Sequence, residues 1–149
     1  VSVTRIARTV AAATDDDSLT RLARMVVLAV AVGNLDLHAK NLSLIHRIDG
    51  TITLAAAYDI VPQTHFPNDQ EMALAVNGEY RHAALTSADL VAELTTWGID
   101  DAEALVRGTL TAVRDAVAAE QPDRRAYTNL RADIDRFITN LLAGHPAGA

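Results

Sequence analysis

The 149-residue sequence contains no cysteine, which excludes a disulfide framework and a metal site built from thiolates. Basic residues are also few: lysine and arginine together number 13 against 19 acidic residues, for a net charge of −6. Lys40 is the only lysine. Because no basic block runs along the chain, direct binding to nucleic acid or to an anionic membrane surface is not expected.

Long hydrophobic runs are missing as well. The longest, Met25 to Val32, is far shorter than the roughly 18 residues that a membrane span requires. Arg5 and Arg8 interrupt the start of the chain, so it does not read as a signal peptide. Together with the absence of cysteine, these features predict a soluble, cytoplasmic protein. At 50% hydrophobic and 21% charged residues, the chain is expected to form one globular domain over residues 1–149.

Apolar residues at helical spacing predict a mainly α-helical protein. The expected helices cover residues 2–13, 19–32, 86–97, 100 to just before Pro122, and 123–142. The second of these is apolar on nearly all sides in its C-terminal half, so it should lie at the centre of the domain. Residues 143–149 contain two glycines and a proline and are expected to be a flexible tail.

A small β-hairpin is expected in the middle of the chain. Two β-prone runs, Leu42–Ile45 and Thr51–Ala55, flank Asp49-Gly50, a dipeptide that suits a tight turn. Met72–Val76 is a further short strand candidate, ended by Asn77-Gly78.

A dense polar cluster, GNLDLHAKNLS, lies between the buried helix and this hairpin. Asp36 and Asn41 are five residues apart, and Asp59 follows the second strand. If the strands pair, Asn41 and Asp59 lie at the same end of the hairpin. Their oxygens suit Mg²⁺, and Asp36 would remain free to accept a proton from an attacking hydroxyl. Taken singly, Asp36 and Asn41 could be simple loop or capping residues, but together with Asp59 they favour a phosphotransfer site.

This layout is similar to that of protein-kinase-like phosphotransferases: a loop aspartate, an asparagine five residues later, a hairpin and a metal-binding aspartate. The segment D-L-H-A-K-N resembles the kinase D-x-x-x-x-N loop and the D-L-H-x-x-N loop of small-molecule phosphotransferases. More specifically, GNLDLHAKNLSLI, AAAYDIVP, MALAVNG and LTSADL closely resemble the HipA-like serine/threonine kinases, the toxins of HipA/HipB toxin–antitoxin pairs. The resemblance covers about residues 15–142.

The resemblance implies a role for each matching residue. Asp36 would be the catalytic aspartate, and Asn41 and Asp59 would bind Mg²⁺ and, through it, ATP. His38 and Lys40 would shape the catalytic loop, and both would contact the nucleotide phosphates or the substrate. The tyrosine before Asp59 is expected to have a packing role. The implied partners are ATP, a protein substrate and a HipB-like DNA-binding antitoxin.

Two features of a complete kinase are absent from the sequence. No G-x-G-x-x-G loop is present, and the only lysine lies inside the catalytic loop, so it cannot also be the strand lysine that holds the ATP phosphates. We therefore expect a protein-kinase-like C-terminal lobe without its N-terminal lobe, which another chain could supply. Alone, such a lobe should bind nucleotide weakly and transfer little phosphate.

Two other functions are compatible with the same motifs. The D-L-H segment also suits a small-molecule phosphotransferase of the aminoglycoside-modifying kind, although Y-D-I-V-P speaks against it. A decayed kinase lobe retained as a non-catalytic binding module is the second. Magnesium-dependent nucleotide binding would distinguish a catalytic lobe from a decayed one.

Overall fold

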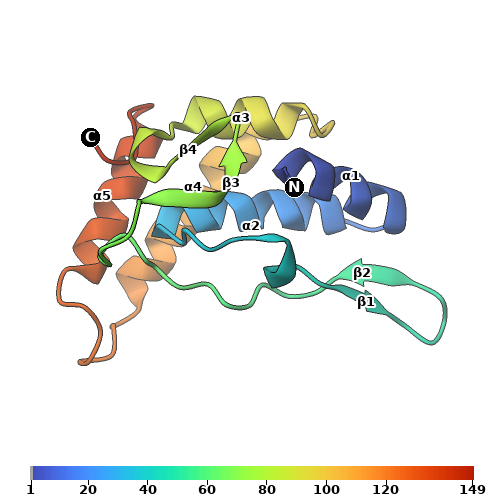
Figure 1. Cartoon of the computed structure of the whole chain (residues 1–149), viewed down its shortest axis with the longest axis horizontal. Helices are drawn as coiled ribbons and strands as arrows, with labels where there is room; N and C mark the ends of the chain where they lie inside the picture. Colours follow the sequence, from blue (N-terminus) through green and yellow to red (C-terminus); the bar gives the residue numbers. More distant parts are fainter. Residues whose placement is uncertain (1) are drawn as a thin grey trace.

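The computed structural model describes residues 2–149 and is mainly helical, with two small antiparallel sheets (Figure 1). The α-helices are α1 (Val3–Ala13), α2 (Ser18–Val32), α3 (Ser87–Thr95), α4 (Ala102–Ala119) and α5 (Leu130–Leu142). Strands β1 (Leu44–His46) and β2 (Ile52–Leu54) form one sheet, and β3 (Glu71–Val76) and β4 (Glu79–Arg81) form the other. Two short 3₁₀ turns, η1 (Ala39–Asn41) and η2 (His82–Ala84), precede β1 and follow β4.

Helix α2 is the centre of the domain, as its apolar sequence predicts. It packs against α1, α4, α5 and β2, and every residue from Ala29 to Val32 is buried (Figure 1). Burial on all sides explains why the C-terminal half of this helix carries no polar stripe, whereas its N-terminal half keeps Arg24 exposed. Within residues 2–149, no helix combines the length and the apolarity that crossing a membrane would need.

The other helices lie close to their predicted positions, with one clear correction. Helix α5 begins at Leu130, whereas the sequence pattern predicted a helix from residue 123. The reason is local: the Asp123 carboxylate accepts a hydrogen bond from the Arg125 N–H (2.8 Å) and pairs with its guanidinium (3.0 Å). A side chain that satisfies nearby backbone N–H groups in this way favours a turn over a helix.

The predicted hairpin is confirmed. Leu44 lies opposite Leu54 and His46 opposite Ile52, and the hairpin is anchored to α2 because the Ser18 hydroxyl accepts from the Leu54 N–H (2.8 Å). The expectation of a single hairpin is wrong, because β3 continues into β4. Asn77 and Gly78 do end β3, but both adopt positive φ (51° and 83°), which turns the chain back.

Residues 143–149, expected to be a flexible tail, are docked on the domain. The N–H groups of Ala147 and Gly148 donate to the carbonyls of Leu85 (2.8 Å) and Ala83 (3.0 Å), and Ala147 is fully buried. The Asn140 amide also donates to the carbonyl of Ala147 (3.1 Å). The tail thus lies beside η2.

Candidate active site

The polar loop after α2 begins at a glycine that no other residue can replace without strain. Gly33 ends the helix with a φ of 69°, and the next N–H, of Asn34, returns to the Ala29 carbonyl (2.8 Å). A Cβ atom on Gly33 would lie 2.7 Å from Cγ2 of Thr64. The loop therefore leaves the helix in one direction, packed against the segment that carries Thr64.

Gly33→Ala is expected to destabilise the chain by more than the roughly 1–2 kcal/mol that a left-handed alanine costs by itself, because the new methyl group also meets Thr64. Gly78→Ala is the matched control: Gly78 has a φ of 83° but open space around its Cβ position. Urea unfolding of both variants measures the difference. Equal losses would show that the contact with Thr64 does not restrict the loop.

Two asparagine side chains hold the backbone of Asp36. The Asn34 side-chain oxygen accepts from the Asp36 N–H (3.2 Å), and the Asn41 side-chain nitrogen donates to the Asp36 carbonyl (2.9 Å). Both asparagines are buried, whereas the Asp36 side chain is 52% exposed. The Leu35 carbonyl accepts from the Ala73 N–H (2.7 Å), which ties the same loop to β3. The Asp36 carboxylate is thus presented to solvent from a fixed backbone.

The hydrogen bond of Asn41 also orients its amide. Because the nitrogen is turned toward the Asp36 carbonyl, the amide oxygen points elsewhere and keeps its capacity to accept or to ligate. This orientation is what a metal-binding role for Asn41 requires.

His38 and Lys40 are less strongly fixed. His38 Nε2 lies 3.6 Å from the nearer Asp36 oxygen, which is beyond hydrogen-bond distance, and its Nδ1 is buried without a hydrogen-bond partner in the described residues. The Lys40 side chain is exposed on η1. Both lie in the loop where the sequence placed them, and their contacts with phosphate or substrate stay predictions.

The segment that carries Asp59 is tied to the catalytic loop by its neighbour, Tyr58. The Tyr58 hydroxyl donates to the Lys40 carbonyl (2.9 Å) and accepts from the Ser43 hydroxyl (2.8 Å). These two bonds bring the segment after β2, in which Asp59 follows Tyr58, back to the loop that carries Lys40 and Asn41. Figure 1 shows the chain running back beside the hairpin after β2. The predicted packing role therefore describes only part of what Tyr58 does, because the residue is 41% exposed and its hydroxyl bridges Lys40 and Ser43.

Asp59 itself has an uncommon backbone conformation, with a φ of 55° and an exposed side chain. Aspartate tolerates this left-handed region better than most residues, but such conformations persist only where the surrounding structure enforces them. The Tyr58 bridge is one such constraint.

The donor set fits a magnesium ion better than a transition metal. Asn41 and Asp59 offer hard oxygen atoms, and Mg²⁺ is commonly held by one or two protein oxygens together with phosphates and water. Within residues 2–149, no group of three or more His, Cys, Asp or Glu side chains is arranged to hold a metal ion. A site made by Asn41 and Asp59 would therefore depend on the nucleotide phosphates to complete it.

A buried histidine contacts the end of α2, where the loop begins. His82 is 2% exposed, and its Nε2 lies 2.7 Å from the Val30 carbonyl, to which it donates. Burial lowers the pKa of His82, so the ring is neutral at pH 7. The ring meets the edge of Phe137, which lies beneath Gly33, and so α5 contributes to the position of the loop.

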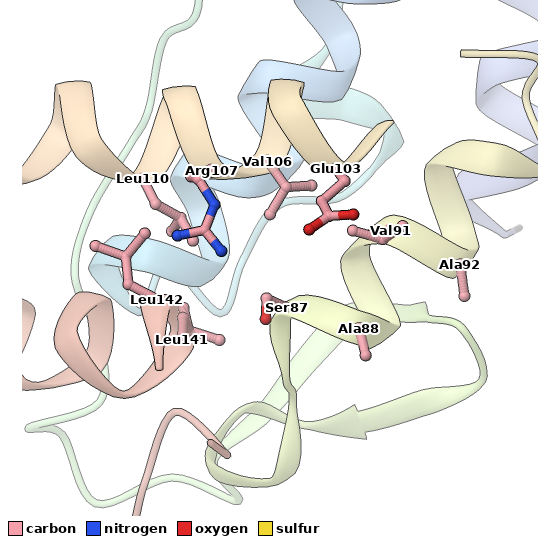
Figure 2. Close-up of a pocket in the computed structure, with 10 residues that line it drawn as sticks. All are labelled: Ser87, Ala88, Val91, Ala92, Glu103, Val106, Arg107, Leu110, Leu141 and Leu142. Carbon is pink, nitrogen blue, oxygen red and sulfur yellow. The ribbon is translucent and has the colours of Figure 1, made fainter. Parts of the chain in front are cut away.

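Two hollows on the domain differ in their relation to this site. A groove of about 470 Å³ is lined by Leu35 and Asp36, by the loop that precedes β3 (residues 63–69), by β3 and by Tyr80 of β4. A second cavity, of about 370 Å³, lies between α3, α4 and α5 (Figure 2). Its wall is largely apolar, and Arg107 and Glu103 extend into it from α4. None of the predicted site residues lines this second cavity.

The sequence pattern thus located the loop but missed the residues that shape it. Asn34 precedes Asp36 by two residues, a spacing at which an asparagine commonly bonds the later backbone N–H, and this signal was available. The Tyr58 bridge depends on a contact across the hairpin end and had no local signal.

Known proteins resemble this chain in sequence and in fold. The family model described as the HipA-like C-terminal domain matches residues 1–121. Among solved structures, the chain is similar to HipA in a complex of the toxin–antitoxin system HipA, HipB and operator DNA from Shewanella oneidensis MR-1. The TM-score is 0.68 at 20% identity, and the match covers 96% of this chain and 34% of that one. At this identity the structural likeness shows the fold alone. A search of curated proteins found no match.

Proposed function

The chain belongs to the family of HipA-like C-terminal domains, and from this premise we propose that it is the C-terminal lobe of an ATP-dependent serine/threonine protein kinase. The observation that carries the proposal is the pair of hydrogen bonds that present Asp36 and Asn41 together. One side chain offers a free carboxylate and the other a free amide oxygen, on a backbone that both asparagines hold.

In this proposal Asp36 accepts the proton of the acceptor hydroxyl as that oxygen forms a bond to the γ-phosphorus of ATP. The bond from the γ-phosphorus to the bridging oxygen breaks, and ADP leaves. Asn41 and Asp59 would hold Mg²⁺, which would offset the negative charge of the phosphates. His38 lies beside Asp36 and Lys40 is exposed in the same loop, and both are proposed to contact the phosphates or the acceptor.

A second lobe is needed to complete this enzyme. The single lysine lies in the catalytic loop, and the match spans about a third (34%) of the length of the HipA chain. We propose that an N-terminal lobe, on further sequence or on another chain, supplies the lysine that holds the phosphates. We refer to the two lobes together as the assembled enzyme. A HipB-like antitoxin is the proposed regulatory partner, since the similar structure is a complex with HipB.

Nucleotide binding by the 149-residue chain tests the metal site directly. We expect Mn²⁺ with ATP to broaden the backbone amide signals near Asn41 and Asp59 in NMR spectra, because Mn²⁺ takes the same oxygen ligands as Mg²⁺. Broadening detects weak binding, which is what a lobe without the phosphate-holding lysine should show. Asp59→Asn is expected to remove most of it, because the amide carries no charge.

The control is Asp135→Asn, which makes the same chemical change at an exposed position on α5. It should leave the broadening unchanged. If the signals near Asn41 and Asp59 respond no more than the rest of the chain, the chain has no metal–nucleotide site, and the non-catalytic binding module becomes the better description.

A further inference from the structure

The groove beside Asp36 is built onto the catalytic loop by main-chain hydrogen bonds. On one wall, the Gln63 N–H donates to the Gly33 carbonyl (2.8 Å). On the other, the Ala73 N–H donates to the Leu35 carbonyl (2.7 Å). Because both bonds end on the loop that carries Asp36, the groove keeps a set position relative to the Asp36 carboxylate. A molecule that lies in the groove therefore passes this carboxylate.

All the charged side chains that line the groove are acidic. Its lining includes Asp36, Asp69 and Glu71 but no lysine, arginine or histidine. Arg81 lies opposite Glu71 in the pairing of β3 with β4. Its guanidinium, however, lies 3.6 Å from the carboxylate of Glu79, which is not a lining residue of the groove. A groove of this charge repels phosphate groups and attracts cations. The nucleotide phosphates are therefore expected to bind near Lys40 and Asn41 and not in the groove.

Two aromatic rings line the same groove. Phe66 and Tyr80 are each 49% exposed, although rings of this size usually bury most of their surface. The exposed face of such a ring binds ammonium and guanidinium groups, and it also packs against the aliphatic stems of lysine and arginine. Carboxylates and aromatic faces in one groove thus suit a long cationic side chain better than an apolar or an acidic one.

We propose that this groove binds the acceptor segment of the protein substrate, and that the segment carries lysine or arginine next to the serine or threonine that meets Asp36. The inference rests on the proposed kinase function and adds to it the chemical class of the acceptor. Asp69 and Glu71 pair with the flanking cations, and Phe66 and Tyr80 cover their stems.

Peptide binding to the 149-residue chain tests the inference without any phosphotransfer. Two fluorescent serine peptides, identical except for arginine or glutamate on both sides of the serine, are compared by fluorescence anisotropy. The arginine peptide should bind at least tenfold more tightly at low salt, and raising the salt concentration should reduce the difference. Asp69→Asn with Glu71→Gln should weaken the arginine peptide about three- to tenfold. Tyr80→Ala should weaken it about two- to fivefold.

The matched control is Asp100→Asn with Glu103→Gln, which removes the same two charges near the start of α4, away from the groove. It should leave the preference intact. The double variant Asp69→Asn with Glu71→Gln is expected to fold, because Asp69→Asn keeps a side-chain oxygen that can accept from the N–H of residue 71. Thermal unfolding of both double variants verifies this.

Three binding results would overturn the inference: equal affinity for the two peptides, no measurable binding of either, or tighter binding of an aminoglycoside such as kanamycin than of the arginine peptide. The last would assign the groove to a small polycation. Failure of the kinase proposal looks different. In that case the arginine peptide binds selectively, but the assembled enzyme does not phosphorylate it. If the assembled enzyme phosphorylates both peptides with equal KM, the kinase proposal stands and the inference about the groove falls.

Discussion

Asp36→Asn is expected to lower phosphotransfer by the assembled enzyme by a factor of about 10²–10⁴, the usual contribution of a positioned general base. An amide has nearly the shape of a carboxylate but cannot accept the proton of the attacking hydroxyl at neutral pH. The loss should appear in kcat, since Asp36 is proposed to act on the acceptor while Asn41 and Asp59 hold the metal. Phosphorylation of a serine peptide, followed with labelled ATP, measures it.

Stability separates this effect from a folding defect. The Asp36 side chain is 52% exposed, and the hydrogen bonds that hold this residue use its backbone. The free energy of unfolding should therefore change by no more than about 0.5 kcal/mol. Asp135→Asn on α5 is the control for both measurements. A variant that kept more than about a tenth of the activity would exclude Asp36 as the general base.

Glu93→Ala is expected to lower the free energy of unfolding by about 3–5 kcal/mol. This is a large part of the roughly 5–15 kcal/mol by which a folded domain is stable. Glu93 is only 7% exposed and accepts three hydrogen bonds. They come from the Thr4 hydroxyl (2.7 Å), the Asn77 N–H (2.8 Å) and the Trp97 ring nitrogen (3.0 Å). The carboxylate thus joins α1, the turn between β3 and β4, and α3. Without it, buried donors lose their partner.

A graded series tests this assignment by urea unfolding. Glu93→Gln keeps one oxygen but places an amide nitrogen where a second donor points, so its loss should be smaller, about 1–3 kcal/mol. Glu103→Ala, at an exposed position on α4, should change stability by no more than about 0.5 kcal/mol. If Glu93→Ala cost less than about 1 kcal/mol, the three hydrogen bonds would not hold the elements together as described. Hydrogen exchange should then show no added opening of the turn at Asn77.

Local patterns predicted much of this structure because their causes are local. The apolar stretch that ends at Gly33 is a buried helix, and Asp49-Gly50 turns a hairpin, as their sequences indicate. The family was also recognisable, since the spacing of Asp36, Asn41 and Asp59 is a property of the chain and needs no coordinates. The same reasoning failed where a side chain competed with the helix, at Asp123, and where a turn continued into a second strand, at Asn77.

By itself, then, the sequence determined the helices, the first hairpin, the family and the identity of the polar residues in the loop. Only the tertiary structure decided how those residues are held and what lies beside them. Tyr58 bridges the hairpin end, Ala73 fixes Leu35, and Glu93 joins three elements, each through a contact between residues separated in the chain. Periodicity and spacing report the backbone conformation of neighbouring residues. They carry no information about which distant groups will share a hydrogen bond, because that depends on how the finished elements pack.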